Sequence, residues 1–232
     1  MIADRVAAVR ERLSRAAERA SREPSSVTLV AVSKTFPAQD VRTAFRAGLR
    51  DFGENRVQEA EPKIEALADL AAAGLRWHLI GHLQSNKARR AAALFDAVQS
   101  VDSLDLGRRL ARAAQEAGRE LRALVQVDLA GEQTKFGLPE EQLMPALEGL
   151  RGSAGIRIEG LMVLPPFFDE PEQARPFFRR LRGLAEQAAA AGLLAGRELS
   201  MGMSHDFEIA VEEGATMVRV GTAIFGGRPP AA

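Results

Sequence analysis

Short apolar segments alternate with helical segments along this chain, and this alternation limits the folds available to it more than any other feature. Strands are predicted at 27–33, 49–52, 76–80, 97–100, 121–127, 156–162, 198–201 and 216–220. Helices are predicted at 2–21, 36–47, 53–73, 85–94, 104–117, 139–150, 171–191 and 205–213. Strands that alternate with helices normally form a parallel sheet with right-handed crossovers. The pattern therefore predicts an α/β fold.

The number of repeats and the length of the chain favour closure of this sheet. Eight strands alternating with helices in 232 residues fit a (β/α)8 barrel of the TIM type. We predict a single domain of this kind over residues 1–232, with the helix at 2–21 as an extra element outside the sheet or across its bottom. A doubly wound open sheet is the alternative, because periodicity does not show whether a sheet closes.

Composition argues against several classes of partner. Basic and acidic side chains number 31 each, so nucleic acid is a poor candidate partner. The chain has no cysteine, which excludes disulfides and thiolate chemistry and favours a cytoplasmic location. No apolar stretch approaches the roughly 20 residues of a membrane span, and the first residues lack an apolar signal segment, so no membrane partner is expected.

A lysine stands at the exit of the first predicted strand. The run 27–33 is apolar and rich in β-branched residues, which is typical of a strand buried on both faces, and Lys34 follows it directly. Ligands bind at the carboxyl ends of strands in such sheets, because the connecting loops converge there. Lys34 is therefore a candidate nucleophilic amine. The alternative is a lysine that only ends the strand and extends to water.

Two glycine-bearing segments, 202–204 and 221–223, follow the last two predicted strands. Barrels often bind phosphate with the loops at this position, where glycine lets backbone N–H groups approach an anion and the hydroxyls of Ser204 and Thr222 add donors. The alternative is that the glycines only form turns and Ser204 caps the next helix. Together with Lys34, these segments suggest a phosphorylated carbonyl compound held as a Schiff base. Pyridoxal 5′-phosphate and an aldolase substrate both fit this description.

Six motifs distributed along the chain point to a known family. They are Ala31–Thr35 (AVSKT), Phe52–Glu59 (FGENRVQE), Trp77–Lys87 (WHLIGHLQSNK), Gly160–Met162 (GLM), Leu199–Ser204 (LSMGMS) and Val218–Gly226 (VRVGTAIFG). Together they closely resemble the pyridoxal phosphate homeostasis protein family, also called the YggS or PROSC family. The resemblance runs from about residue 2 to Arg228. Segment 131–137 also fits the family pattern, although its residues suggest no chemistry.

The resemblance implies a barrel like the N-terminal domain of bacterial alanine racemases, with pyridoxal 5′-phosphate as the cofactor. The positions implied to contact the cofactor are Lys34, Asn55, His82, Met203, Ser204, Arg219, Gly221 and Thr222. In the family pattern the lysine carries the cofactor as a Schiff base, and the arginine faces the pyridine nitrogen. The serine, glycine and threonine near the end of the chain contact the phosphate, and the other three residues line the cofactor.

An arginine at position 219 would affect the chemistry of the cofactor if it faced the pyridine ring. A guanidinium only donates hydrogen bonds, so it disfavours protonation of the pyridine nitrogen and weakens the cofactor as an electron sink. The alternative is an outward salt bridge at the strand end. For Met203 the alternative is core filling, and His78 and His205 are expected to be structural or capping residues. The histidines share no metal-ligand motif, so no metal site is expected.

The chain contains no tyrosine. In the alanine racemases that the fold resembles, a lysine serves one face of the reacting adduct and a tyrosine from an additional domain serves the other, so that mechanism cannot operate here unchanged. We therefore expect no catalytic residues and a monomeric protein that binds, buffers and delivers pyridoxal phosphate, affecting amino-acid and keto-acid metabolism indirectly. The expected partners are the cofactor and, transiently, enzymes that require it. A weak amino-acid racemase and a Schiff-base aldolase are the alternatives.

Overall fold

The computed structural model describes residues 1–131 and 136–227. Within these residues the strands are β1 (Thr28–Val32), β2 (Asp51–Glu54), β3 (Arg76–Leu79), β4 (Ala97–Val101), β5 (Leu121–Asp128), β6 (Leu138–Pro139), β7 (Ile156–Val163), β8 (Glu198–Ser200) and β9 (Met217–Val220). The α-helices are α1 (Ile2–Arg19), α2 (Ala38–Arg46), α3 (Val57–Ala66), α4 (Ala88–Leu94), α5 (Leu104–Glu116), α6 (Glu140–Leu150), α7 (Arg175–Ala190), α8 (Phe207–Glu212) and α9 (Thr222–Phe225). Short 3-10 helices are η1 (Pro24–Ser26), η2 (Ala68–Leu70), η3 (Ser85–Lys87) and η4 (Pro171–Ala174). Residues 132–135 of segment 131–137, and residues 228–232, lie outside the described residues.

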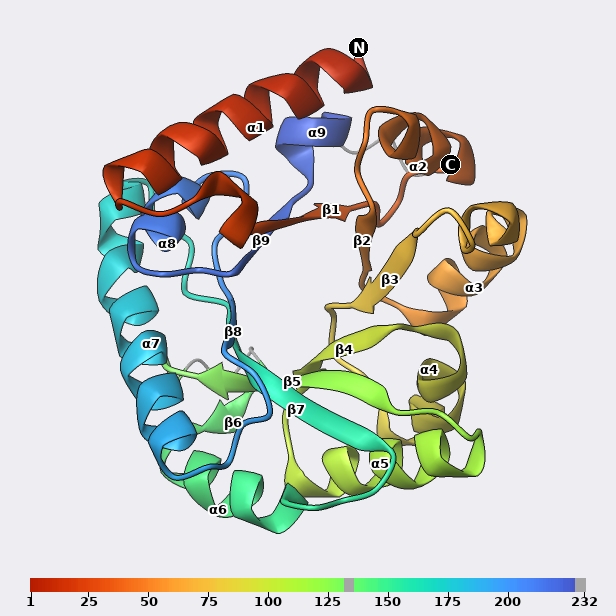
Figure 1. Cartoon of the computed structure of the whole chain (residues 1–232), viewed down its shortest axis with the longest axis vertical. Coiled ribbons are helices and arrows are strands. Elements are labelled where there is room, and N and C mark those ends of the chain that lie inside the picture. Colours follow the sequence, from red (N-terminus) through yellow and green to blue (C-terminus); the bar gives the residue numbers. More distant parts are fainter. Residues whose placement is uncertain (132–135, 228–232) are drawn as a thin grey trace.

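The strands form a closed parallel barrel surrounded by helices (Figure 1). Their order around the ring is β4-β3-β2-β1-β9-β8-β7-β5, and a parallel pairing of β4 with β5 joins the two ends. In the described part of the chain β6 pairs with β5 alone, outside the ring. The prediction of a (β/α)8 barrel is confirmed, and the open sheet is excluded because the β4–β5 pairing closes it.

Helix α1 packs on the outside of the barrel beside α8 and α9 (Figure 1). Its buried side chains include Val6, Val9 and Leu13, whose spacing of three and four residues places them on one face. Ion pairs also tie the helix to α8, of which Arg12 with Glu208 measures 2.7 Å. The predicted extra N-terminal helix is thus confirmed on the outside of the barrel.

The prediction for the second strand was shifted by two residues, and the helix after it, predicted at 53–73, is shorter and spans Val57–Ala66. Strand β2 begins at Asp51 rather than at residue 49, and Gly53 and Glu54 belong to it instead of opening a helix. The sheet imposes this boundary, because the Ser33 N–H donates to the Gly53 carbonyl at 3.0 Å and the Ile80 N–H donates to the Glu54 carbonyl at 2.9 Å. Glycine and glutamate have weak strand preference, so tertiary pairing overrides local preference here.

Buried side chains occupy two layers that differ in polarity. Between the strands and the helices the core is mainly apolar, as alternation along each strand requires, with Glu54 and Lys63 as a buried charged pair within it. The inside of the barrel contains polar side chains: Gln99 of β4 hydrogen-bonds Ser200 of β8, although β4 and β8 are not neighbours in the ring. Arg219 of β9 also bonds Ser200, and both are almost inaccessible to solvent. The bond between Gln99 and Ser200 is possible only across the interior of the barrel, whereas Arg219 reaches Ser200 from the neighbouring strand.

Asp51 lies at the amino-terminal end of this interior, where β2 begins. The Arg76 guanidinium donates to both of its carboxylate oxygens at 2.7 Å, and Nε2 of His78 lies 2.9 Å from Oδ1. Burial opposes ionisation of Asp51, but the bonds from Arg76 and His78 outweigh it and hold the pKa of this carboxyl well below its ordinary value.

The substitution Asp51→Asn should therefore destabilise the fold in a pH-dependent way. Because the unfolded chain binds the proton more tightly than the folded one, Asp51 stabilises the fold above its unfolded-state pKa of about 4 and loses this contribution as pH falls toward the lower folded-state pKa. We expect a loss of about 2 kcal/mol in the free energy of unfolding at neutral pH. Urea denaturation of both proteins should show the difference narrowing below about pH 4. A difference that is independent of pH would contradict this assignment.

Candidate functional site

The loops that follow the strands bring the predicted residues to the carboxyl end of the barrel. Lys34 follows β1, and Gly221 follows β9, which pairs with β1 in parallel with Ala31 opposite Val220. Asn55 follows β2, the other neighbour of β1, and His82 follows β3. Met203, Ser204 and Thr222 lie in the same layer of loops, and Arg219 lies within β9 just below them.

Charged side chains of α3 form hydrogen bonds with the loop that carries Lys34. Lys63 donates from Nζ to the Ser33 carbonyl and to Oε1 of Glu54, each at 2.9 Å, and the Ser33 hydroxyl donates to the same Glu54 oxygen at 2.7 Å. Thr35 has a φ of +69°, which is unusual for a β-branched residue, and its N–H donates to the Glu59 carboxylate. These contacts fix the backbone on both sides of Lys34. Lys34 itself is half-buried.

Glu54 and Lys63 form a buried ion pair in the wall of the barrel. Glu54 has no exposed surface, and its Oε2 has no hydrogen-bond partner among the described residues. Burial raises the pKa of Glu54 above its ordinary value, and the attraction of Lys63 opposes this. The sequence does not predict this pair. Glu54 lies in β2 and Lys63 in α3, and the two side chains meet only when the helix packs on the strand.

Ser204 lies where two backbone N–H groups converge. The N–H groups of Gly221 and Ala223 both donate to its Oγ, at 3.2 and 3.4 Å. Helix α8 begins at Phe207 with Asp206 as its N-cap, so Ser204 contacts the loop after β9 rather than capping the next helix as the alternative proposed. The loop before Ser204 needs glycine at 202, where φ is +89° and a Cβ would lie 2.5 Å from the Cβ of Ala210. Two backbone N–H groups and a hydroxyl therefore lie together here, and donors of these kinds can bind a phosphate oxygen when they turn to it.

Arg219 is buried inside the barrel below this cradle. Nη1 donates to the Ser200 hydroxyl at 2.6 Å, and Nη2 donates to the Val163 carbonyl at 2.8 Å. Burial lowers the pKa of Arg219 to about 10, and the nearby Asp206 opposes this shift. The alternative of an outward salt bridge is therefore wrong, because the side chain is 3% exposed and points into the barrel. A guanidinium has five N–H donors, so the two bonds do not exhaust them.

His82 occupies a more open position on the same face. Its Nδ1 lies 2.8 Å from the Asp102 carboxylate, and its ring stacks on Phe136 with centroids 3.5 Å apart. Together with Asn55 it lines a groove of about 830 Å³ that also includes Lys87. Sequence reasoning did not foresee Asp102 as a partner of His82, although both follow neighbouring strands.

The remaining histidines and methionines have simpler surroundings. His78 is buried in the barrel and contacts Asp51, which agrees with a structural role. His205 is exposed, and its Nε2 lies 3.1 Å from the Asp169 carbonyl, so it does not cap a helix. Met203 is half-buried, and its N–H donates to Asp206 at 2.6 Å. No cluster of three metal-ligating side chains occurs in residues 1–131 and 136–227.

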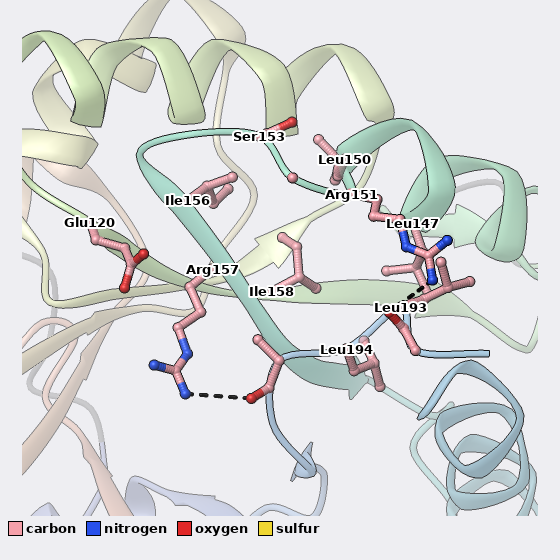
Figure 2. A pocket seen from close by; sticks show the side chains of 13 residues that line it. Glu120, Leu147, Leu150, Arg151, Ser153, Ile156, Arg157, Ile158, Leu193 and Leu194 are labelled. Atoms are coloured by element: carbon pink, nitrogen blue, oxygen red, sulfur yellow. Dashed lines mark hydrogen bonds between the residues drawn. The ribbon is translucent and has the colours of Figure 1, made fainter. Parts of the chain in front are cut away.

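A second cavity lies at the opposite end of the barrel, where β7 begins (Figure 2). It measures about 470 Å³ and is lined by Ile156 and Ile158 of β7 and by Leu150 of α6. Arg157 donates to the Ala195 carbonyl at 3.4 Å across its edge. Loops at the amino ends of barrel strands normally serve stability rather than chemistry. This cavity is therefore not the candidate site.

Comparisons with known proteins give the family. The family model for the N-terminal domain of alanine racemase matches residues 5–229. The pyridoxal phosphate homeostasis protein of Pseudomonas aeruginosa is 45% identical over 228 residues, which cover 98% of this chain and 96% of that protein. The chain belongs to the pyridoxal phosphate homeostasis protein family. Another member of this family, from Aquifex aeolicus, is 40% identical over 97% of both chains.

Solved structures agree with this membership. PipY of Synechococcus elongatus, in a structure with pyridoxal phosphate bound, superposes with a TM-score of 0.86 at 44% identity over 97% of this chain and all of that chain. Alanine racemase of Clostridium difficile superposes with a TM-score of 0.69 at 15% identity, over 96% of this chain and 60% of that enzyme. The second likeness concerns the fold alone. In the described part of this chain, helices lack the length and apolarity needed to cross a membrane.

The buried pair behind Lys34 gives a test by stability. Lys63→Met should lower the free energy of unfolding by about 3 kcal/mol, because Glu54 loses its buried partner. The double variant Lys63→Met/Glu54→Gln should lose less than the single variant, because no charge is then left buried alone. Urea denaturation at neutral pH measures both values. A double variant that loses at least as much free energy of unfolding as Lys63→Met would contradict the coupling between the two charges.

Proposed function

We propose that this protein binds pyridoxal 5′-phosphate at the carboxyl end of the barrel, with its aldehyde carbon held by Lys34 as a Schiff base. The convergence of Lys34, the Ser204 cradle and the buried Arg219 at one end of the barrel carries the proposal. The PipY structure with pyridoxal phosphate bound supports the same cofactor for a protein of this fold and family.

The residues present fit the chemical groups of this cofactor. The Ser204 hydroxyl and the N–H groups of Gly221 and Ala223 suit the phosphate, with the hydroxyl of Thr222 close by in the chain. Arg219 below them suits an uncharged ring nitrogen, because it only donates hydrogen bonds. Asn55, His82 and Met203 complete the face in this proposal. The cofactor supplies an aldehyde and an electron-withdrawing ring when it is bound.

The role that this site supports is holding and releasing the cofactor rather than catalysis. Arg219 would disfavour protonation of a ring nitrogen bound beside it, because a guanidinium only donates hydrogen bonds, and the ring would then be a weak electron sink. The chain has no tyrosine to act opposite the lysine. Attack of water on a Schiff base at Lys34 would return the free aldehyde and the lysine amine, and attack of another amine would form a new Schiff base and release Lys34. Either route would let Lys34 pass the cofactor to enzymes that require it. We place this activity in intracellular cofactor homeostasis, by a cytoplasmic monomer.

Binding at Lys34 can be tested by spectroscopy and peptide mapping. The purified protein incubated with pyridoxal phosphate should turn yellow, and borohydride should fix the cofactor on the peptide that contains Lys34. Lys34→Ala should abolish the fixed adduct, whereas Lys87→Ala, on the same face, should retain it. An adduct that persists in Lys34→Ala would contradict the assignment. A colourless protein that takes up sugar phosphates covalently would favour an aldolase.

The absence of catalysis can be tested by isotope exchange. The protein loaded with pyridoxal phosphate should exchange the α-hydrogen of amino acids in deuterium oxide no faster than Lys34→Ala does, because a ring whose nitrogen faces Arg219 would be a weak electron sink. Nuclear magnetic resonance of a panel of L- and D-amino acids measures the exchange. Lys34-dependent exchange with repeated turnover would favour a racemase, with His82 and Asp102 as the first residues to substitute.

A further inference from the structure

A continuous line of hydrogen bonds crosses the inside of the barrel from Arg219 to Asp51. Nη1 of Arg219 donates to Oγ of Ser200, and Ser200 donates to Oε1 of Gln99, each at 2.6 Å. Nε2 of Gln99 lies 3.0 Å from Nδ1 of His78, whose Nε2 lies 2.9 Å from the Asp51 carboxylate. The line joins β9, β8, β4, β3 and β2, and all five residues are buried.

All hydrogen bonds in this line run in one direction. An ionised Asp51 only accepts, so a neutral imidazole at His78 carries its proton on Nε2, and Nδ1 then accepts from Gln99. Gln99 must then present its NH₂ group to His78 and its carbonyl to Ser200. The Ser200 hydroxyl donates to that carbonyl, and its oxygen is left to accept from Arg219. The charge of Asp51 thus determines the orientation of every group up to the guanidinium.

The line holds Arg219 in a defined orientation below the candidate site. Ser200 of β8 and the Val163 carbonyl of the neighbouring strand β7 accept from the two terminal nitrogens, so the plane of the guanidinium is fixed. Buried polar side chains are stabilised only when they are fully bonded, and the interior of such barrels is normally filled by branched apolar residues. Leu124, Met162 and Met217 show that apolar residues fill the remaining space here.

We propose that Gln99, His78, Ser200 and Asp51 are positioning residues that aim Arg219 at the ring nitrogen of the bound cofactor. This inference rests on the proposed function, because it requires pyridoxal phosphate in the site. Gln99 itself is separated from Arg219 by Ser200, so it acts on the ring only through this line.

The test uses the full-length protein loaded with pyridoxal phosphate that is labelled with ¹⁵N in the ring. Gln99→Met retains the length of the side chain but removes both of its hydrogen bonds in the line, together with the long bond from Nε2 to the Met217 sulfur at 3.6 Å. The matched control is Met162→Leu, which changes the packing of the same interior outside the line. Nuclear magnetic resonance reports the ring nitrogen, and titration gives the dissociation constant of the cofactor. Ser200→Ala serves as a second variant if Gln99→Met does not fold.

We expect Gln99→Met to shift the ring ¹⁵N resonance away from the wild-type position and to weaken cofactor binding about tenfold, with the borohydride adduct still on Lys34. Met162→Leu should leave the resonance unchanged even if it lowers stability. A wild-type resonance and affinity in Gln99→Met or Ser200→Ala would overturn the inference while the proposed function stands. A wild-type protein that takes up no cofactor would overturn the proposed function, and this inference with it.

Discussion

The pairing of β4 with β5 closes the sheet, and the candidate site depends on this closure. Closure brings the carboxyl ends of all strands in the ring to one face, so Lys34 after β1 and Ser204 after β8 lie on the same side of the molecule. It also creates an interior in which side chains from distant strands meet. Arg219 can contact Ser200 there while its backbone N–H donates to the Gly202 carbonyl at 3.0 Å, directly below the loops.

Charged groups on both sides of the barrel wall support the site. Inside the wall, Arg219 remains cationic at neutral pH, because burial lowers its pKa only to about 10. Outside the wall, Lys63 donates to the backbone carbonyl of Ser33, next to Lys34, and Glu54 accepts from the Ser33 hydroxyl. Buried charges are costly unless they are bonded, so their presence around one short loop indicates that its position matters. Rigid support of this kind lets a reversible covalent site bind without reorganising the fold.

Position along the chain was sufficient to predict part of this arrangement. The sequence shows where the strands end, so it predicts that Lys34 and the loops with Ser204 and Gly221 lie on one face. The predicted barrel is confirmed as well. The line from Arg219 to Asp51 could not be predicted, because its members lie on five strands and meet only when the barrel closes. The fold also explains the glycine of the Gly160–Met162 motif, because a Cβ at Gly160 would lie 1.9 Å from the Glu198 carbonyl oxygen.

A crystal structure of the protein with pyridoxal 5′-phosphate tests the central claim most directly. The account predicts continuous electron density from Nζ of Lys34 to the cofactor, with the phosphate on Ser204 and the Gly221 amide and the ring nitrogen within hydrogen-bond distance of Arg219. A cofactor bound in the groove beside His82, with its phosphate on Lys87 and its ring away from Arg219, would contradict it.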